Sequence, residues 1–364
     1  MASIRDIARI AGVSSASVSR ILNNDPTFHI NDEARKRVIH VANKLHYSKG
    51  KKKRGPKQND PQLSIALIMR HDHAREIDDP YFLNMHMGIN DEAKKWHLRI
   101  DQPFKMNDQE KDWSILANYG AVLIEGEMTP EAIKSIQTIN HNVIFLDVNT
   151  NILNCNIIRN DFVEKTTYIL DLLHSLGHEN IVYIGGKSSI MDLDGKITTE
   201  KCDLRETRYI SWMKLHNLDQ YCHSFITDWS ADSALKITDQ VIQLKERPTA
   251  IVVGSDPIAL GVYKALNNHH ISIPDDISVV SFDDVDINRF LTPTLSSVYM
   301  DTKEMGKTAV RLAKDLITEN ISIPLTVTCH SNLNQSRQSI DCFKMIHFSH
   351  KILMGRLIIN TCVH

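Results

Sequence analysis

The sequence predicts a small N-terminal all-α domain followed by an α/β core of two doubly wound parallel-sheet lobes. Near the N-terminus apolar residues recur at helical spacing, whereas from residue 63 short apolar runs alternate with helical stretches. Charge divides in the same way, because residues 1–57 contain thirteen Lys or Arg against four Asp or Glu, and the remainder 29 against 40. A basic N-terminal segment followed by an acidic remainder is expected when a small domain binds a polyanion and a larger domain has a different function.

Composition excludes several classes of protein. No apolar run approaches the roughly 20 residues of a membrane span, and charges interrupt the first apolar pattern, which argues against a signal or transit peptide. The six cysteines lack a C-x-x-C pair, which favours reduced thiols over zinc. The sequence therefore predicts a cytoplasmic protein with no metal site and no cofactor.

Three short helices are predicted in residues 1–48. The first has a buried side formed by Ile4, Ile7, Ala8 and Ala11, and Gly12 ends it. The second starts after Ser14 as N-cap and buries Val18, Ile21 and Leu22. The third opens at Asn31 and has Val38, Val41, Ala42 and Leu45 at helical spacing. Two short helices joined by a glycine turn and braced by a third indicate a helix-turn-helix DNA-binding domain, whose second helix enters the major groove.

The outward side of the second helix is small and polar. It comprises Ser15, Ala16, Ser19 and Arg20, with Ser17 at the edge. Small residues let a backbone approach the groove closely, hydroxyls can bond bases or phosphates, and an arginine can donate to guanine O6 and N7. Arg20 is therefore the best candidate base reader. A serine-rich surface helix with no partner is the alternative, which the adjacent basic charge disfavours.

The stretch "DIARIAGVSSASVSRILN" resembles the pattern "DIAxxAGVSxxTVSRxLN" of the lactose/galactose repressor (LacI/GalR) family. By this resemblance Ser15 and Ala16 occupy the operator-reading positions and Arg20 the base-contacting arginine. The resemblance also implies that Ser14, Ser19 and Asn23 touch phosphate. Ser17 departs from the usual threonine but keeps the hydroxyl.

Residues 49–61 form a basic linker rich in Lys, Gly and Pro. Most members of the family have a short hinge helix here, with the pattern N-x-x-A-x-x-L, and this chain lacks it. We expect Lys51, Lys52, Lys53 and Arg54 to add salt-dependent affinity for phosphates, with little kinking of the operator centre. Whether any hinge helix forms on DNA stays open.

Residues 62–340 are predicted to form the core. Apolar runs such as "LSIALIM", "NVIFLDV" and "ISVVSFDD" alternate with helical stretches, which is typical of parallel sheets covered on both faces. We expect lobe one near residues 62–160 and 293–320, and lobe two near 161–292 and 321–340. Ligands of such sheets bind beyond the carboxyl ends of the strands, where the sequence places Arg70, Glu125, Asp147, Asp256 and Asp283.

The family resemblance extends to about residue 340 and implies a periplasmic-binding-protein-like core that holds a small effector between two lobes. Arg205 matches the family's ligand-binding arginine, Asp283 its strand-end aspartate and Trp229 a sugar-stacking tryptophan. Plainer interpretations stay open: Arg205 could pair with Asp203 or Glu206 on the surface, Trp229 could be a core residue, and Asp256 could be an N-cap. Ser255 stands where the family has asparagine or aspartate.

Two stretches, "REIDDPYFLNMHMGINDEAKK" and "NDPTFHINDEARKRV", are similar to the evolved β-galactosidase repressor type, and "DWSA" is similar to the lactose repressor type. This resemblance implies a galactoside effector, with Asp79, Tyr81 and Phe82 lining the crevice. It predicts a repressor of a lactose or galactoside operon that binds a near-palindromic double-stranded operator as a homodimer or higher oligomer and is released by the sugar. The alternatives are another sugar or an activator. No catalytic motif is present, so an enzyme or a stand-alone sugar-binding protein is disfavoured.

Residues 341–364 form an atypical C-terminal extension. Family members usually end soon after an "L-x-x-R-x-S" element, seen here as "LNQSRQS", whereas this chain continues. The extension lacks the leucine repeat of a tetramerising coiled coil. The sequence therefore does not decide between a dimer and a tetramer.

Overall fold

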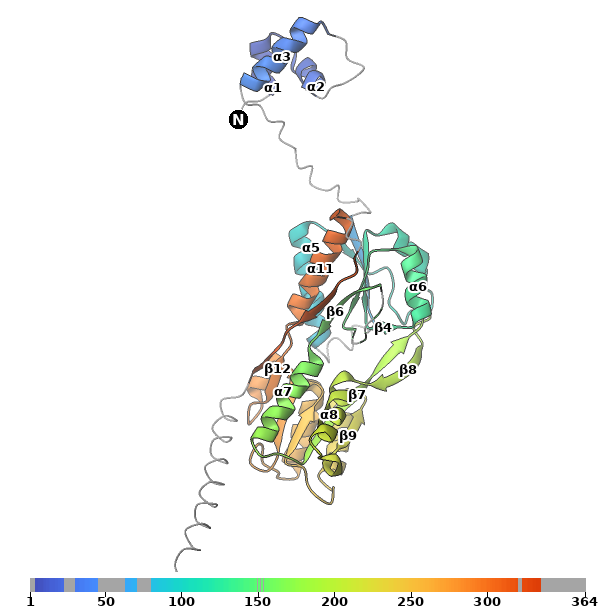
Figure 1. Ribbon diagram of the computed structural model, residues 1–364, viewed down its shortest axis with the longest axis vertical. Helices are drawn as coiled ribbons and strands as arrows, with labels where there is room; N and C mark the ends of the chain where they lie inside the picture. Colours follow the sequence, from blue (N-terminus) through green and yellow to red (C-terminus); the bar gives the residue numbers. More distant parts are fainter. Residues whose placement is uncertain are drawn as a thin grey trace, which may run out of the picture. The chain divides into compact units, whose positions relative to one another are not determined.

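The computed structural model describes residues 4–22, 30–44, 63–70, 80–148, 150, 152, 154–319 and 323–334. Five predicted DNA-binding residues lie outside this part, namely Asn23, Lys51, Lys52, Lys53 and Arg54. Asp79 and the C-terminal extension also lie outside it. The chain divides into two compact units, Met1–Lys57 and Gln58–His364 (Figure 1).

The first unit contains helices α1 (Ile4–Ala11), α2 (Ser15–Leu22) and α3 (Asp32–Lys44). Gly12 follows α1 with a φ of 67°, a conformation that glycine adopts at no steric cost. Asn31 caps α3, because its side-chain oxygen accepts the Ala34 N–H at 2.7 Å. The predicted apolar faces of the three helices meet in one core, formed by Ile7, Ala8, Ala11, Val18, Ile21, Val38, Val41 and Ala42.

Lobe one of the second unit is a six-stranded parallel sheet with helices on both faces. The strand order is β13-β6-β5-β3-β1-β2. The strands are β1 (Ser64–Ile68), β2 (Arg99–Asp101), β3 (Ala121–Glu125), β5 (Val143–Leu146), β6 (Asn156–Asn160) and β13 (Thr326–Cys329). Helices α5 (Pro80–Trp96) and α11 (Thr302–Glu319) bury one face of the sheet, and α6 (Pro130–Ile139) buries the other. A 3-10 helix covers Trp113–Asn118.

Lobe two is built on strand β7 (Ile181–Met191), which pairs in parallel with β9 (His223–Thr227) and β10 (Ala250–Val253). The sheet continues through β11 (Ser278–Asp283), β12 (Ser296–Tyr299) and β14 (Asn332–Asn334). One face packs on α7 (Phe162–Ser175) and α8 (Leu204–Leu215), and the other on α9 (Ala231–Val241) and α10 (Asp256–Asn268). Two 3-10 helices cover Asp219–Tyr221 and Asp286–Phe290.

The lobe boundaries differ from those expected at two strands. β12 (Ser296–Tyr299) pairs with β11 and belongs to lobe two, whereas β13 (Thr326–Cys329) pairs with β6 and belongs to lobe one. The burial of their apolar side chains explains both: Val298 packs in the lobe-two core, and Val327 packs against the lobe-one core. The chain therefore crosses between the lobes after β6, after β12 and after β13.

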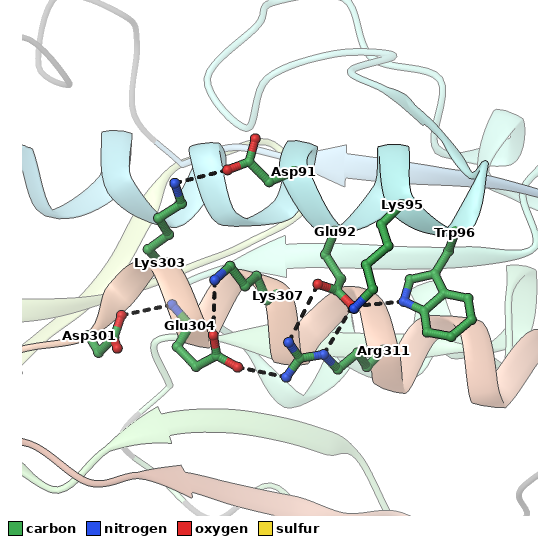
Figure 2. Close-up of polar contacts among 9 residues, drawn as sticks. All are labelled: Asp91, Glu92, Lys95, Trp96, Asp301, Lys303, Glu304, Lys307 and Arg311. Atoms are coloured by element: carbon green, nitrogen blue, oxygen red, sulfur yellow. Dashed lines mark hydrogen bonds and ion pairs between the residues drawn. The ribbon is translucent and has the colours of Figure 1, made fainter.

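Helices α5 and α11 cross closely because two glycines face the partner backbone. A Cβ on Gly88 would lie 2.0 Å from the Lys303 carbonyl oxygen, and one on Gly306 would lie 2.1 Å from that of Met85. Beside this crossing, the Glu92 carboxylate accepts bonds from Arg311 Nε at 3.1 Å and from Trp96 Nε1 at 2.7 Å (Figure 2). Among the helices of the described residues, none is long and apolar enough to cross a bilayer.

We expect Glu92→Gln to lower the free energy of unfolding by about 1 kcal/mol, because the amide weakens the charge-assisted bond from Arg311 but can still accept one from Trp96. The bonds from Arg311 lower the pKa of Glu92 to about 2. Its stabilising contribution is thus complete above the usual glutamate pKa and is lost as the pH falls from there towards 2. Urea unfolding between pH 2 and 7 measures both effects.

Asp91→Asn is the matched control, because Asp91 pairs with Lys303 on the exposed side of the same helices at 2.9 Å. An exposed pair contributes little to stability, because water screens its charges. If both variants lose the same stability, the bond between Glu92 and Arg311 does not contribute specifically to the packing of α5 against α11.

Candidate functional site

The candidate DNA-reading surface lies on α2. Its N-terminus is capped by Ser14, whose Oγ accepts the Ser17 N–H at 3.0 Å and lies 2.9 Å from the Ser17 hydroxyl. This helix orientation, set by the burial of Val18 and Ile21, leaves Ser15, Ala16 and Arg20 exposed on the opposite side. Ser17 and Ser19 are half-buried at the edge. The exposed ridge is thus narrow and small, with one long cationic side chain at Arg20.

A cavity of about 680 Å³ lies between the two lobes of the second unit. Lobe one contributes residues at the ends of its strands and the start of α5, and lobe two contributes strand ends and the second half of β7. Six of the eight predicted effector residues line the cavity: Tyr81, Phe82, Arg205, Trp229, Ser255 and Asp283. Asp79 lies outside the described residues.

Arg205 is the most constrained of these side chains. It is buried, and its Nε and Nη2 donate to the two oxygens of Asp203 at 2.6 and 3.1 Å, while Nη1 donates to the Gly254 carbonyl at 2.6 Å. Asp203 also caps α8 through the Arg205 N–H. The pairing with Asp203 that the sequence left open does occur, but in the cavity wall and not on the surface. The guanidinium is a fixed donor array at the edge of the cavity.

Burial and pairing act in opposite directions on this ion pair. Burial favours the neutral form of Asp203, but the Arg205 charge and its hydrogen bonds outweigh burial and lower the pKa of Asp203. The pKa of Arg205 is raised, because Asp203 outweighs the effect of burial on the guanidinium. Both groups are therefore ionised within the cavity wall.

Trp229 provides an aromatic surface beside Arg205. Its indole Nε1 donates to the Lys187 carbonyl at 3.0 Å, and its ring lies 5.0 Å from the guanidinium carbon. A Cβ on Gly186 would lie 2.2 Å from the ring, so only glycine fits under it. The ring is half-buried and lines the cavity, which is what a sugar-stacking residue requires.

Tyr81 ties the start of α5 to the ends of strands β5 and β6. Its hydroxyl donates to Asp147 at 2.7 Å and accepts a bond from Asn160 Nδ2 at 2.5 Å. Asp147 lines the cavity, and burial raises its pKa to about 6 despite the bond from Tyr81. Phe82 packs edge to face on Tyr81, with ring centroids 5.1 Å apart. Tyr81 therefore positions a carboxylate that can accept hydroxyl protons.

Asp283 and Ser255 lie at adjacent strand ends of lobe two. Asp283 has a φ of 104°, and its Oδ2 lies 3.4 Å from the Asp256 backbone nitrogen at the start of α10. Ser255 precedes α10 and makes no side-chain capping bond in the described structure. Both residues line the cavity.

Asp256, which was predicted as an effector residue, is not among the residues that line the cavity. The carboxylate is fully buried and accepts bonds from the Val285 N–H at 2.8 Å, Asn288 Nδ2 at 2.6 Å and Ser297 Oγ at 2.8 Å. Asp256 is also the first residue of α10 and not its N-cap, which is Ser255. Burial raises its pKa. Its role is to join α10 to the segment after β11.

Several cavity residues were missed as site residues by sequence reasoning. Phe162 and Asp203 are two of them, and the remainder lie mainly on a hairpin of β7 and β8 (Ile197–Cys202), which contributes Lys187, Ser188, Ser189, Met191, Ile197 and Glu200. Arg70 and Asp147 were noticed only as strand ends. The dipeptide Asp194-Gly195 between two runs of strand formers is a hairpin signal that could have located the hairpin. Nothing comparable marks Phe162, which is the first residue of α7.

The arrangement suits binding and not catalysis. Carboxylates, a fixed guanidinium and an aromatic face surround a concave space, as in sites that orient polar ligands. Within the described part of the chain, no group of three His, Cys, Asp or Glu side chains could hold a metal ion.

Comparison with known proteins agrees with both units. The model of the bacterial regulatory proteins of the lacI family matches residues 3–49, and that of the periplasmic binding protein-like domain matches residues 170–336. The chain is 31% identical over 344 residues to the HTH-type transcriptional regulator GalR of Lacticaseibacillus casei, which covers 93% of this chain and 100% of GalR. It is 30% identical to the HTH-type transcriptional repressor MelR of Bacillus subtilis (strain 168), covering 94% and 98% of the two chains.

Two solved structures share the fold at low sequence identity. A transcriptional regulator CelR–cellobiose complex aligns with a TM-score of 0.64 at 17% identity, covering 92% of this chain and 99% of that one. The lac repressor dimer bound to operator and the anti-inducer ONPF aligns with a TM-score of 0.61 at 20% identity, covering 92% and 98%. The helix-turn-helix unit, the two-lobed core and the relatives all agree: the chain belongs to the LacI family and is a DNA-binding transcriptional regulator, not an enzyme.

Proposed function

We propose that the protein is a repressor that binds a near-palindromic operator as a homodimer and is released by a small galactoside bound between its lobes. The observation that carries the proposal is the cavity, where the Arg205 guanidinium, the Trp229 ring and the Asp283 carboxylate face one space. A guanidinium donates to sugar oxygens, a carboxylate accepts from sugar hydroxyls, and an indole packs on the C–H face of a pyranose. Together these groups orient a sugar.

The operator part of the proposal rests on the ridge of Ser15, Ala16 and Arg20. One such helix reads only a few base pairs, so useful affinity requires two copies on two half-sites. Ser14 precedes this ridge and Ser19 lies at its edge, and we propose that both contact phosphates, although the Ser14 hydroxyl also caps α2. A ligand that binds one arrangement of the lobes more tightly shifts operator affinity by a coupling free energy of about 1 to 3 kcal/mol.

The choice of a galactoside over other sugars is the more specific part of the proposal. It is supported by the resemblance of the stretch that contains Tyr81 and Phe82. Proteins of the same fold are solved with bound cellobiose, ribose and glucose, which agrees with a sugar effector but does not select a galactoside. A LacI-family regulator with another sugar effector is the alternative. The sugar that fits is set by the polar groups of the cavity wall, since the aromatic face accepts many pyranoses.

A gel-shift titration tests the proposal. The full-length protein is first used to select a DNA duplex from a random library. Galactose, lactose and allolactose are then each titrated into the complex of the protein with this duplex. We expect at least one of them to release the duplex. Release by none of these sugars, combined with release by a different sugar or a purine, would reject the galactoside.

We expect sugar affinity to fall as the pH drops below about 6. Burial raises the pKa of Asp147 to about 6, and only the ionised carboxylate accepts two hydroxyl bonds. A ligand that selects the ionised form loses up to about tenfold in affinity per pH unit below that pKa. Isothermal titration calorimetry at pH 5, 6 and 7 measures the dependence.

Asp147→Asn is the control for this pH dependence. The variant keeps an acceptor for the Tyr81 hydroxyl but has no proton to gain, so its weaker binding should not change between pH 5 and 7. If the variant keeps the dependence of the natural chain, a different group is responsible.

A further inference from the structure

The β7–β8 hairpin connects the two lobes across the cavity. The first half of β7 belongs to the lobe-two sheet, whereas its second half pairs with β8 and its last two residues pair with β4 (Glu127–Met128), which directly follows β3 of lobe one. Arg70 of lobe one also donates to Ser189 on β7. The hairpin therefore forms part of the cavity wall while it is attached to both lobes.

The tip of the hairpin rests on the loop before the 3-10 helix of lobe one. Trp113 Nε1 donates to the Leu193 carbonyl at 3.0 Å, and Lys111 Nζ donates to the Asp194 carbonyl at 2.7 Å. Gly195 has a φ of 77°, and a Cβ there would lie 2.0 Å from the Met106 carbonyl oxygen. These contacts fix the hairpin over the cavity.

A bulge places two chemically different side chains of β8 on the same face. Glu200 pairs with Ser189, Thr199 with Ile190, and Ile197 with Met191, so Thr198 has no paired residue across the ladder. Cross-strand partners share a face and neighbours alternate, so Ile197 and Glu200 both face the cavity although they are three residues apart. Thr199 lies on the opposite face.

The hairpin end of the cavity is far from the Trp229 end. Gly186 packs under Trp229, and Met191 comes five residues later on the same strand, so at roughly 3.3 Å per residue the two are about 16 Å apart. A hexose has about twelve non-hydrogen atoms, and at roughly 30 Å³ for each, the share of a water molecule in the liquid, it occupies at most about 360 Å³. The cavity of about 680 Å³ is nearly twice this upper bound, so a single hexose leaves much of it unfilled.

We propose that the β7–β8 hairpin forms a second glycosyl subsite and that the effector is a disaccharide. Ile197, which is 47% exposed, packs on the apolar face of the second ring, and Glu200 accepts its hydroxyl protons. The first ring occupies the Trp229 end. This inference rests on the proposed function of the cavity as a sugar site.

The test compares monosaccharides with disaccharides by calorimetry on the full-length protein. The probes are galactose with lactose and melibiose, and glucose with cellobiose and maltose. For the sugar that binds, we expect the disaccharide to bind at least about tenfold more tightly than its monosaccharide, the ratio expected for one added charge-assisted hydrogen bond. Glu200→Gln and Ile197→Ala should remove most of this advantage and leave monosaccharide affinity within about twofold. Thr199→Ala, on the opposite face of the same strand, should change neither affinity.

The outcomes separate this inference from the proposed function. Tight binding of cellobiose or maltose with no binding of galactosides would reject the galactoside but support the second subsite. Equal affinity for a monosaccharide and its disaccharide, or an equal loss of both in the hairpin variants, would overturn the subsite while the sugar site stands. Binding of none of these sugars would overturn both.

Discussion

Replacing Arg205 with alanine is expected to lower the free energy of unfolding by about 3 to 5 kcal/mol, the usual cost of removing one partner of a buried ion pair. The variant leaves the Asp203 carboxylate buried without its guanidinium, and it leaves the Gly254 carbonyl without its donor. It also removes the cation that lies 4.1 Å from the Phe162 ring and 5.0 Å from the Trp229 ring. Urea unfolding measures the loss of stability.

The same variant is expected to abolish release from the operator by the sugar. Because a destabilised protein could fail for a trivial reason, the control is the double variant Arg205→Ala with Asp203→Asn, which removes the uncompensated charge. We expect it to recover part of the stability and still not to respond to sugar. If the double variant is released from the operator at the same sugar concentrations as the natural chain, Arg205 has only a structural role.

The elements of this fold were predictable where burial dictates the residue pattern. The continuous apolar runs form buried strands such as β3 and β11. The apolar residues with i, i+3, i+4 spacing form the shared core of α1, α2 and α3. Lobe membership was less predictable, because the chain leaves lobe two only after β12 and leaves lobe one again only after β13. That choice depends on the packing of distant parts of the chain, which no local pattern records.

The sequence predicted the types of residue in the candidate site better than the directions in which their side chains point. Asp256 and Asp283 both follow lobe-two strands, yet Asp283 lines the cavity and Asp256 points into the protein. The difference comes from the backbone, since the positive φ of Asp283 turns its side chain and the helical start of α10 turns that of Asp256. A sequence shows the carboxylate but not the dihedral angle that aims it.

Replacing Arg20 with alanine is expected to weaken operator binding by about 1 to 3 kcal/mol and to relax the preference at one base pair of each half-site. The reason is geometric: Arg20 is exposed on α2 while its neighbour Ile21 is buried in the three-helix core, so the substitution removes the proposed base contact and leaves the packing of that core intact. Selection from a random duplex library, compared between the variant and the natural chain, measures the change at each position.

Two further variants, each of which loses one positive charge, separate recognition of the bases from electrostatic attraction to the phosphates. Arg37→Ala removes an exposed cation from α3, and Lys52→Ala removes one from the linker. Each should weaken all duplexes alike and reduce the dependence of affinity on salt, because phosphate contacts carry no sequence information. Since the three variants lose the same charge, a change in base preference confined to Arg20→Ala can come only from contact with a base edge. The same uniform weakening in all three would leave α2 as a phosphate-binding helix and assign operator choice to another part of the chain.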